Sequence, residues 1–423
     1  MKSKLLLVLA AALTLALPPG HAAGQPTVIA TIPVAAGNTI GVAANPATNR
    51  IYVANLLGKS VSVIDGATDT VVATVPVGDR PFGVAANATT SRIYVTKVAG
   101  DVVWVIDGAT DTVVATVPVG DSPHSVAANP TTNRIYVTHD RSDNVSVIDG
   151  ATDTVVATVP VGDEPQGVAA NPATNRIYVA NLFGKSVSVI DGATDTVVAT
   201  VPVGVGPCGV AANPTTNVIY VANRDTDNVS VIDGATDTVV ATVPVGDWPH
   251  GIAANPATNR IYVANRDTDN VSVIDGATDA VVVTVPVGNS PHGVAANPIT
   301  NRIYVTNEVD NTVSVLEDLP ATPTPTPMPP RPGDTEDVPL QGGVCNPVST
   351  TYPDGTDIAT IAAAVDPPDL LDSLWEFEGG VWLGYSPEFP AASDLTEKDF
   401  LDVVFICVGG SGPDAATFTR PTV

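Results

Sequence analysis

Short runs of Val, Ile, Ala and Thr recur along most of the chain, separated by clusters of Asp, Asn, Gly and Pro. Within a run, apolar positions alternate with small polar ones or follow one another without a break, as in β-strands that are buried on one or both faces. In the second copy of the pattern, four strands are predicted at 83–87, 92–96, 102–106 and 112–119. The turn-forming residues between the runs support this division. The pattern predicts an all-β protein.

The pattern repeats every 42 residues. An Asp follows Val-Ile in six copies, and Glu317 takes its place in the seventh. The Tyr of an Ile-Tyr-Val motif recurs in all seven copies, at positions 52, 94, 136, 178, 220, 262 and 304. Four strands in a repeat of this length are typical of a β-propeller blade. The repeat region, residues 27–318, is therefore expected to form a seven-bladed β-propeller.

The two ends of the repeat region complement each other. Residues 27–34 match the fourth-strand pattern but have no preceding strands, whereas the last copy, 293–316, lacks a fourth strand. We expect the first strand to complete the last blade, because a closed ring has no open sheet edges. Prolines such as Pro76 and Pro118 in the fourth run fit an outermost strand, where a missing N–H is harmless.

The remaining segments have other compositions. Residues 1–23 combine Lys2 and Lys4 with an apolar run at 5–17 and a small-residue cleavage point, which predicts a secretory signal peptide; a membrane anchor is the alternative. Residues 319–340 form a Pro/Thr-rich linker of the polyproline II type. Residues 341–423 are expected to form a small β-sandwich-like module.

Three cysteines are spread over the chain. Cys345 and Cys407 lie in the C-terminal module, and in a secreted chain we expect them to form a disulfide. Cys208 is then the odd thiol.

Charge narrows the range of functions. The chain has 44 Asp and Glu residues against 18 Lys and Arg residues, a formal net charge of -26. Sequence-independent binding of nucleic acid needs cations for the phosphates, and docking on anionic membranes needs them for the headgroups, so neither is expected. No segment after the predicted signal peptide is long and apolar enough to insert into a membrane. We expect a secreted or cell-surface protein.

A family resemblance agrees with this expectation. The motif Tyr-Val-Thr-Asn at 304–307 reproduces the signature of YVTN-type β-propeller repeat proteins, and Tyr-Val-Ala-Asn at 52–55 is a close variant. The resemblance extends over residues 27–318, and the second copy departs from it most, with Ala88 in place of Pro and Trp104 in place of Ser. It implies an extracellular or surface-associated propeller of bacterial or archaeal type that binds or scaffolds, and it carries no catalytic residue onto this sequence.

Differences between the copies indicate where a ligand would bind. The loops after the first and third strands hardly change, whereas those after the second and fourth vary, and the two kinds of loop emerge on opposite faces of a blade. Loops on a rigid scaffold commonly carry function, although neutral drift also explains such variation. The candidate binding residues on the variable face are Arg80, Phe82, His124, Gln166, Cys208, Trp248, His250, His292, Leu57 and Phe183.

Metal binding and catalysis are alternatives at this face. Cys208, His250 and His292 occupy equivalent positions in three successive copies, and thiolates and imidazoles are metal ligands. The 42-residue spacing comes from the repeat and is no ligand motif, so residues lining a wet channel are the preferred interpretation. A looser resemblance to streptogramin-lyase-like propellers, which use histidine at such a mouth, supports a lyase-like enzyme as the other alternative. The acidic segments 225–228 and 267–270 suggest calcium, but tight turns explain them better.

The preferred hypothesis is a secreted, non-catalytic binding or scaffold protein. It presents the variable face to a protein or cell-envelope ligand. No cofactor and no metal are expected.

Overall fold

The computed structural model describes residues 25–98 and 100–318, together with four two-residue strands further along the chain. By its internal contacts the chain divides into two units, 1–325 and 326–423. In the second unit, β29 (Val365–Asp366) pairs with β32 (Thr417–Phe418), and β30 (Phe377–Glu378) pairs with β31 (Val381–Trp382). The predicted signal peptide, the linker, the Cys345–Cys407 disulfide and most of the C-terminal module lie outside the described residues and stay predictions.

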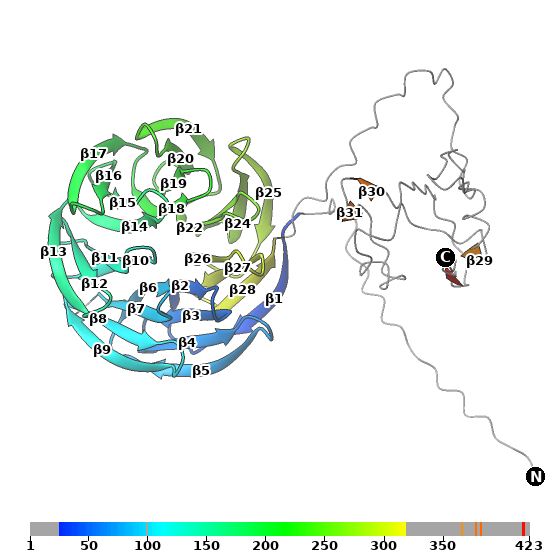
Figure 1. The fold of residues 1–423 in the computed structure, drawn as a ribbon, viewed down its shortest axis with the longest axis horizontal. Helices are drawn as coiled ribbons and strands as arrows, with labels where there is room; N and C mark the ends of the chain where they lie inside the picture. Colours follow the sequence, from blue (N-terminus) through cyan, green and yellow to red (C-terminus); the bar gives the residue numbers. More distant parts are fainter. Residues whose placement is uncertain are drawn as a thin grey trace, which may run out of the picture. The chain divides into compact units, whose positions relative to one another are not determined.

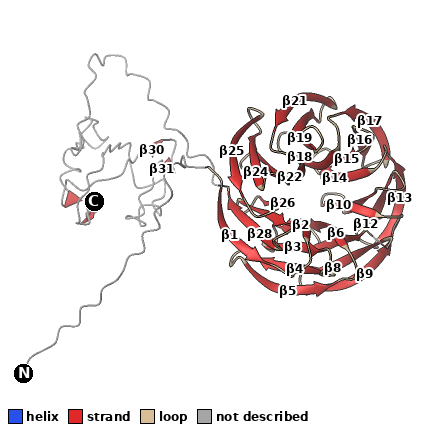
Figure 2. Cartoon of the chain, turned by 180° about the vertical axis from the view of Figure 1, so that it is seen from behind, coloured by secondary structure: helices blue, strands red, loops and turns tan. Residues whose placement is uncertain are grey.

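The first unit is a ring of seven four-stranded antiparallel sheets (Figure 1). In six sheets the strands follow chain order from the axis outwards, and the first strand of the chain joins the seventh sheet. Strands and connecting loops make up the described part of the ring (Figure 2), which contains no helix capable of crossing a membrane. The predicted seven-bladed β-propeller is confirmed.

The strand bounds repeat from blade to blade. The innermost strands are β2 (Thr39–Asn45), β6 (Pro81–Asn87), β10 (Pro123–Asn129), β14 (Pro165–Asn171), β18 (Pro207–Asn213), β22 (Pro249–Asn255) and β26 (Pro291–Asn297). The second strands are β3 (Arg50–Asn55), β7 (Arg92–Lys97), β11 (Arg134–His139), β15 (Arg176–Asn181), β19 (Val218–Asn223), β23 (Arg260–Asn265) and β27 (Arg302–Asn307).

The two outer ranks are equally regular. The third strands are β4 (Ser60–Asp65), β8 (Val102–Asp107), β12 (Asn144–Asp149), β16 (Ser186–Asp191), β20 (Asn228–Asp233), β24 (Asn270–Asp275) and β28 (Thr312–Glu317). The outermost strands are β5 (Thr70–Pro76), β9 (Thr112–Pro118), β13 (Thr154–Pro160), β17 (Thr196–Pro202), β21 (Thr238–Pro244), β25 (Ala280–Pro286) and β1 (Thr27–Pro33).

The innermost strands begin two residues earlier than the sequence pattern predicts. In the second blade Pro81 pairs with Lys97, and a bulge separates this pair from the next one, Val84 with Val95. The Pro and Gly at this point interrupt the apolar run, so the pattern alone places the strand start too late.

The core consists of seven apolar clusters, each lying between two neighbouring blades. In one of them Tyr52 and Val63 of the first blade pack with Ile93 and Ile106 of the second. Because neighbouring blades cover both faces of the second and third strands, those strands are almost fully buried. This explains their continuous runs of Ile, Tyr and Val.

The ring closes through β1, which pairs antiparallel with β28. The pairing runs from Thr27 opposite Glu317 to Pro33 opposite Thr312, with one bulge after Val28. The first residues of the repeat region therefore complete the last blade, as the sequence predicts. The prolines of the fourth runs also lie in outermost strands, as expected.

Amide hydrogen bonds join the blades on the uniform face. The Asn that ends each innermost strand donates across to the next blade, as in Asn87 to Asn133 and Asn171 to Asn217, both at 2.8 Å. In the first blade Asn45 donates instead to the hydroxyl group of Ser91 in the second blade. The bond from Asn297 to Asn49, also 2.8 Å, completes the circle between the last blade and the first.

Two ion pairs among the described residues join the second strand of a blade to the outer turn of the next. Arg92 contacts Asp153 at 3.0 Å, and across the closure Arg302 contacts Asp69 at 2.9 Å. The last blade has no such turn, because its outermost strand comes from the other end of the chain.

Asp318 supplies the missing carboxylate. It is fully buried and accepts hydrogen bonds from Asn255 and Arg260 at 2.8 Å each, and from Thr258. The six other copies have Gly at the equivalent position. The change from Gly to Asp at this position therefore provides the carboxylate that an outer turn provides elsewhere in the ring.

Candidate binding site at the channel mouth

Loops of the two variable kinds emerge together on one face of the ring, as predicted. The residue that precedes each innermost proline has a left-handed backbone, including Arg80 at φ 55° and Trp248 at φ 53°. This conformation is unfavourable for a bulky side chain such as Trp. The carboxylate of Asp227 accepts a hydrogen bond from the Trp248 N–H at 2.9 Å, and Asp269 does the same for Ser290 at 2.8 Å.

These bonds assign a role to the acidic segments at 225–228 and 267–270. One carboxylate of each segment fixes the backbone that leads into the next blade. Among the residues that the structure describes, no group of three His, Cys, Asp or Glu side chains is arranged to hold a metal ion.

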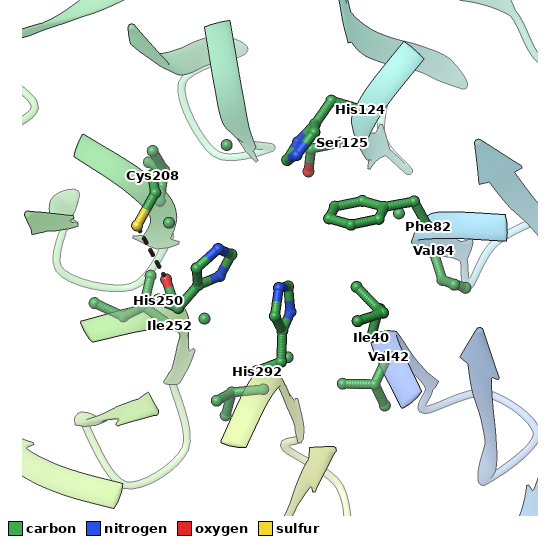
Figure 3. A pocket seen from close by; sticks show the side chains of 18 of the residues that line it. Ile40, Val42, Phe82, Val84, His124, Ser125, Cys208, His250, Ile252 and His292 are labelled. Carbon is green, nitrogen blue, oxygen red and sulfur yellow. Dashed lines mark hydrogen bonds between the residues drawn. The ribbon is translucent and has the colours of Figure 1, made fainter. Parts of the chain in front are cut away.

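The second residue of each innermost strand forms a ring around the axis, which we call the mouth ring: Ile40, Phe82, His124, Gln166, Cys208, His250 and His292. Six of its members, all but Gln166, line a cavity of about 140 Å³ (Figure 3). The glycines and valines that follow them along each strand complete the lining.

Close packing at the axis depends on glycine. A Cβ on Gly251 would lie 2.1 Å from the main-chain oxygen of His292, and one on Gly41 would lie 2.0 Å from that of Phe82. Such distances are far inside van der Waals contact, so the neighbouring blades approach this closely only with Gly. The third blade differs, because Ser125 occupies the equivalent position.

Four members of the mouth ring form a chain of aromatic contacts. The ring centroids of Phe82 and His124 are 4.4 Å apart, and those of His250 and His292 are 3.9 Å apart. Phe82 and His292 meet edge to face at 5.8 Å. All four side chains point towards the axis, where they surround the opening (Figure 3).

The three imidazoles are neutral at pH 7. Burial lowers the pKa of His124 to about 4, and burial together with the nearby positive groups lowers that of His250 to about 3. The pKa of His292 lies well below its usual range for the same reasons. Arg224 and Arg266 are among these positive groups. Each neutral ring therefore offers one donor and one acceptor.

Cys208 belongs to the mouth ring, but its thiol turns away from the opening. Sγ contacts the main-chain oxygens of Pro249 at 3.3 Å and Ala222 at 3.6 Å, and burial raises the pKa of the thiol to about 12. A protonated, buried thiol is a poor nucleophile and a poor metal ligand. Cys208 therefore occupies the position equivalent to that of the histidines, but its thiol does not join their imidazoles at the opening.

Gln166 is also turned aside. Its amide donates to Glu164 at 3.3 Å, and the side chain is buried. The blades of Gln166 and Cys208 thus line the cavity with Gly and Val but direct no aromatic ring into it, so the aromatic lining is asymmetric.

Charged side chains surround the mouth ring at a larger radius. Arg266 contacts Glu308 at 2.8 Å, and the Arg224 guanidinium lies 5.6 Å from the ring centroid of Trp248. Trp248 therefore combines an apolar surface with a neighbouring cation, an arrangement worth about 0.5–1 kcal/mol at an exposed site.

Leu57 and Phe183 lie at loop tips, away from the cavity lining. Their side chains are 60% and 62% exposed. Leu182, next to Phe183, is buried instead. The variable face therefore presents two kinds of feature, a lined opening on the axis and separate apolar tips around it.

Sequence comparison between the copies missed Ile40, the mouth-ring residue of the first blade. It is only 3% exposed, and its small side chain leaves Phe82 and His292 in contact across its position. Subtracting one repeat length from Phe82 would have found it. The contribution of Arg266 was likewise not predicted, since it depends on distances between blades.

The comparisons with known proteins bear on the fold. Residues 211–302 match a family model described as a YNCE-like beta-propeller, which is of the YVTN type. The matched residues and the seven-bladed ring thus resemble YVTN-type β-propellers. No curated protein matches the chain.

Among solved structures, this propeller is similar to Kuenenia stuttgartiensis hydrazine synthase. The match has a TM-score of 0.60 and 21% sequence identity, and it covers 70% of this chain and 98% of that chain. At this identity the similarity shows the shared fold alone, because unrelated functions occur on one fold.

Proposed function

We propose that this propeller is a secreted, non-catalytic binding protein whose variable face takes a protein or cell-envelope ligand. The observation that carries the proposal is the contrast between its faces. The contacts that close the ring repeat from blade to blade, whereas the mouth ring contains five residue types in seven positions. Variation concentrated on one face of a rigid scaffold is typical of a recognition surface.

Exposed apolar side chains on the same face support this proposal. Leu57, Phe183 and Trp248 are each more than a third exposed. Apolar and aromatic anchors of this kind dominate the binding energy of many protein interfaces. The state of Cys208 favours binding over catalysis, because its buried thiol provides no nucleophile beside the imidazoles.

A capture experiment with matched variants tests the proposal. The purified chain is immobilised and exposed to envelope and extracellular proteins of the organism that produces it. Captured proteins are quantified by mass spectrometry. We expect a partner that is retained by the wild type and at least tenfold depleted with a Leu57→Ser, Phe183→Ser double variant. Ile299→Ser is the control, since Ile299 is 75% exposed but lies on the uniform face. Equal capture by all three proteins would count against the proposal.

A further inference from the structure

The cavity at the mouth ring has the size of one small ring. Its volume is about 140 Å³. An engineered apolar cavity of about 150 Å³ in another protein binds benzene, so a six-membered ring fills this space and a fused double ring exceeds it. Phe82 and the three histidines surround its opening (Figure 3).

Its walls favour a flat aromatic occupant. Phe82 with His124 on one side, and His250 with His292 on the other, present rings at 3.9–4.4 Å within each pair. Aromatic rings prefer offset or edge-to-face contacts at centroid distances of about 4.5–7 Å. Phe82 and His292 already touch across the two pairs at 5.8 Å, so an entering ring lies in the opening that the four rings surround and contacts them there (Figure 3).

Charge restricts the occupant further. Burial, the neighbouring His124 and the guanidinium groups of Arg266 and Arg224 all disfavour positive charge at the imidazole of His250. A nucleotide is also too large for a cavity of about 140 Å³. A neutral ring is therefore preferred over an amine or a nucleotide.

The imidazoles also favour a polar group on that ring. Within the described residues, Nδ1 of His124 is buried without a hydrogen-bond partner, whereas the ring nitrogens of His250 and His292 are not among the buried unpartnered atoms and are free to pair with a ligand. Each neutral imidazole has one donor and one acceptor nitrogen. A hydroxyl group both donates and accepts, so it pairs with either nitrogen, whereas an unsubstituted ring leaves both unpaired at a cost.

We propose that the channel mouth binds a single phenol-type ring, whose hydroxyl group pairs with His250 and His292 while its faces pack against the aromatic members of the mouth ring. The proposal rests on the binding function proposed above, and it specifies the chemical group of the ligand that enters the cavity. The ring is either a free phenol or the tyrosine side chain of a partner protein.

Ligand-observed NMR with two probes of similar size tests the proposal on the full chain. The probes are p-cresol and toluene, which differ by the hydroxyl group. A purely apolar cavity prefers toluene, because toluene is the more hydrophobic of the two. We expect saturation transfer to p-cresol with an affinity at least tenfold higher than that for toluene. Equal binding, stronger binding of toluene or no binding of p-cresol overturns the proposal.

Variants locate the interaction. The double variant His250→Phe, His292→Phe keeps the aromatic walls and removes the nitrogens, so the preference for p-cresol should fall to threefold or less. His139→Asn is the control, since His139 lies on β11, outside the mouth, and most other copies have Asn there. A double variant that keeps the full preference contradicts the proposal.

A second readout needs no substitution. In the wild type, p-cresol should shift the Cε1–H resonances of His250 and His292 by its ring current and leave that of His139 in place. Shifts at His139 alone, or at no histidine, contradict the proposal.

The source of the ring is resolved by competition. If N-acetyltyrosine amide displaces p-cresol, the site accepts a tyrosine side chain; if p-cresol binds and the amide does not compete, the site accepts free phenols. Both results support the phenol-type ring. Because Leu57 and Phe183 lie away from the cavity, loss of ring binding with intact partner capture would refute this proposal and leave the proposed function standing.

Discussion

Replacing Asp318 by Gly should destabilise the propeller, even though it makes the last copy match the other six. The substitution removes a fully buried carboxylate that accepts hydrogen bonds from Asn255, Thr258 and Arg260. Removing one partner of a buried ion pair costs about 3–5 kcal/mol. Glycine adds a further loss of about 0.4–1 kcal/mol, because it raises the conformational entropy of the unfolded chain.

Urea unfolding followed by far-UV circular dichroism measures this effect. We expect the free energy of unfolding to fall by about 4 kcal/mol for Asp318→Gly, with an unchanged denaturant slope. Asp318→Asn keeps the shape and removes the charge, so its loss should be smaller.

Glu317→Gln is the matched control for these variants. This residue is adjacent and only half-buried, and a surface change of this kind alters stability by less than about 0.5 kcal/mol. A loss below about 1 kcal/mol for Asp318→Gly, or equal losses for Asp318→Gly and Glu317→Gln, would refute the role assigned to Asp318.

Three further predictions follow from the mouth. Because burial lowers the pKa of His250 to about 3 from its usual 6.5, the unfolded chain takes up the proton first; stability is full above pH 6.5 and is lost as the pH falls towards 3, by up to about 1.4 kcal/mol per pH unit. The unfolding free energy of His250→Phe should depend less steeply on pH over this range, and an identical slope would contradict the prediction. Gly251→Ala places a Cβ 2.1 Å from a main-chain oxygen, so it should unfold at several-fold lower urea concentration or fail to fold, whereas Ser125→Ala at the equivalent position should behave like the wild type; similar behaviour of both would be inconsistent with close blade contact. Cys208, whose thiol pKa is raised to about 12, should resist iodoacetamide at pH 8 until the chain is unfolded in urea, as peptide mapping will show; alkylation in the folded state would disprove its burial.

The blade architecture could be predicted from the sequence because each strand is specified locally. The 42-residue period, the four apolar runs and the spare strand at 27–34 are all visible without coordinates, and all correspond to structure. Strand starts were less accurate, since the pairing of Pro81 depends on a bulge that no apolar pattern encodes.

The candidate site was predictable in position but not in chemistry. Counting by repeats identifies six of the seven mouth-ring residues. It does not reveal that the thiol of Cys208 and the amide of Gln166 turn aside, because side-chain direction is decided by contacts with the neighbouring blade. The stacking of His250 on His292 likewise depends on the distance between blades and not on spacing in the sequence.

The circle of amide bonds that ends with Asn297 and Asn49 has an evolutionary consequence. It joins successive blades through residues that nearly every copy carries, and it uses none of the mouth-ring side chains. A duplicated copy therefore arrives with its own means of attachment, and its mouth residue is free to diverge. A lineage of such chains can change what it recognises one position at a time while the assembly of the ring stays the same.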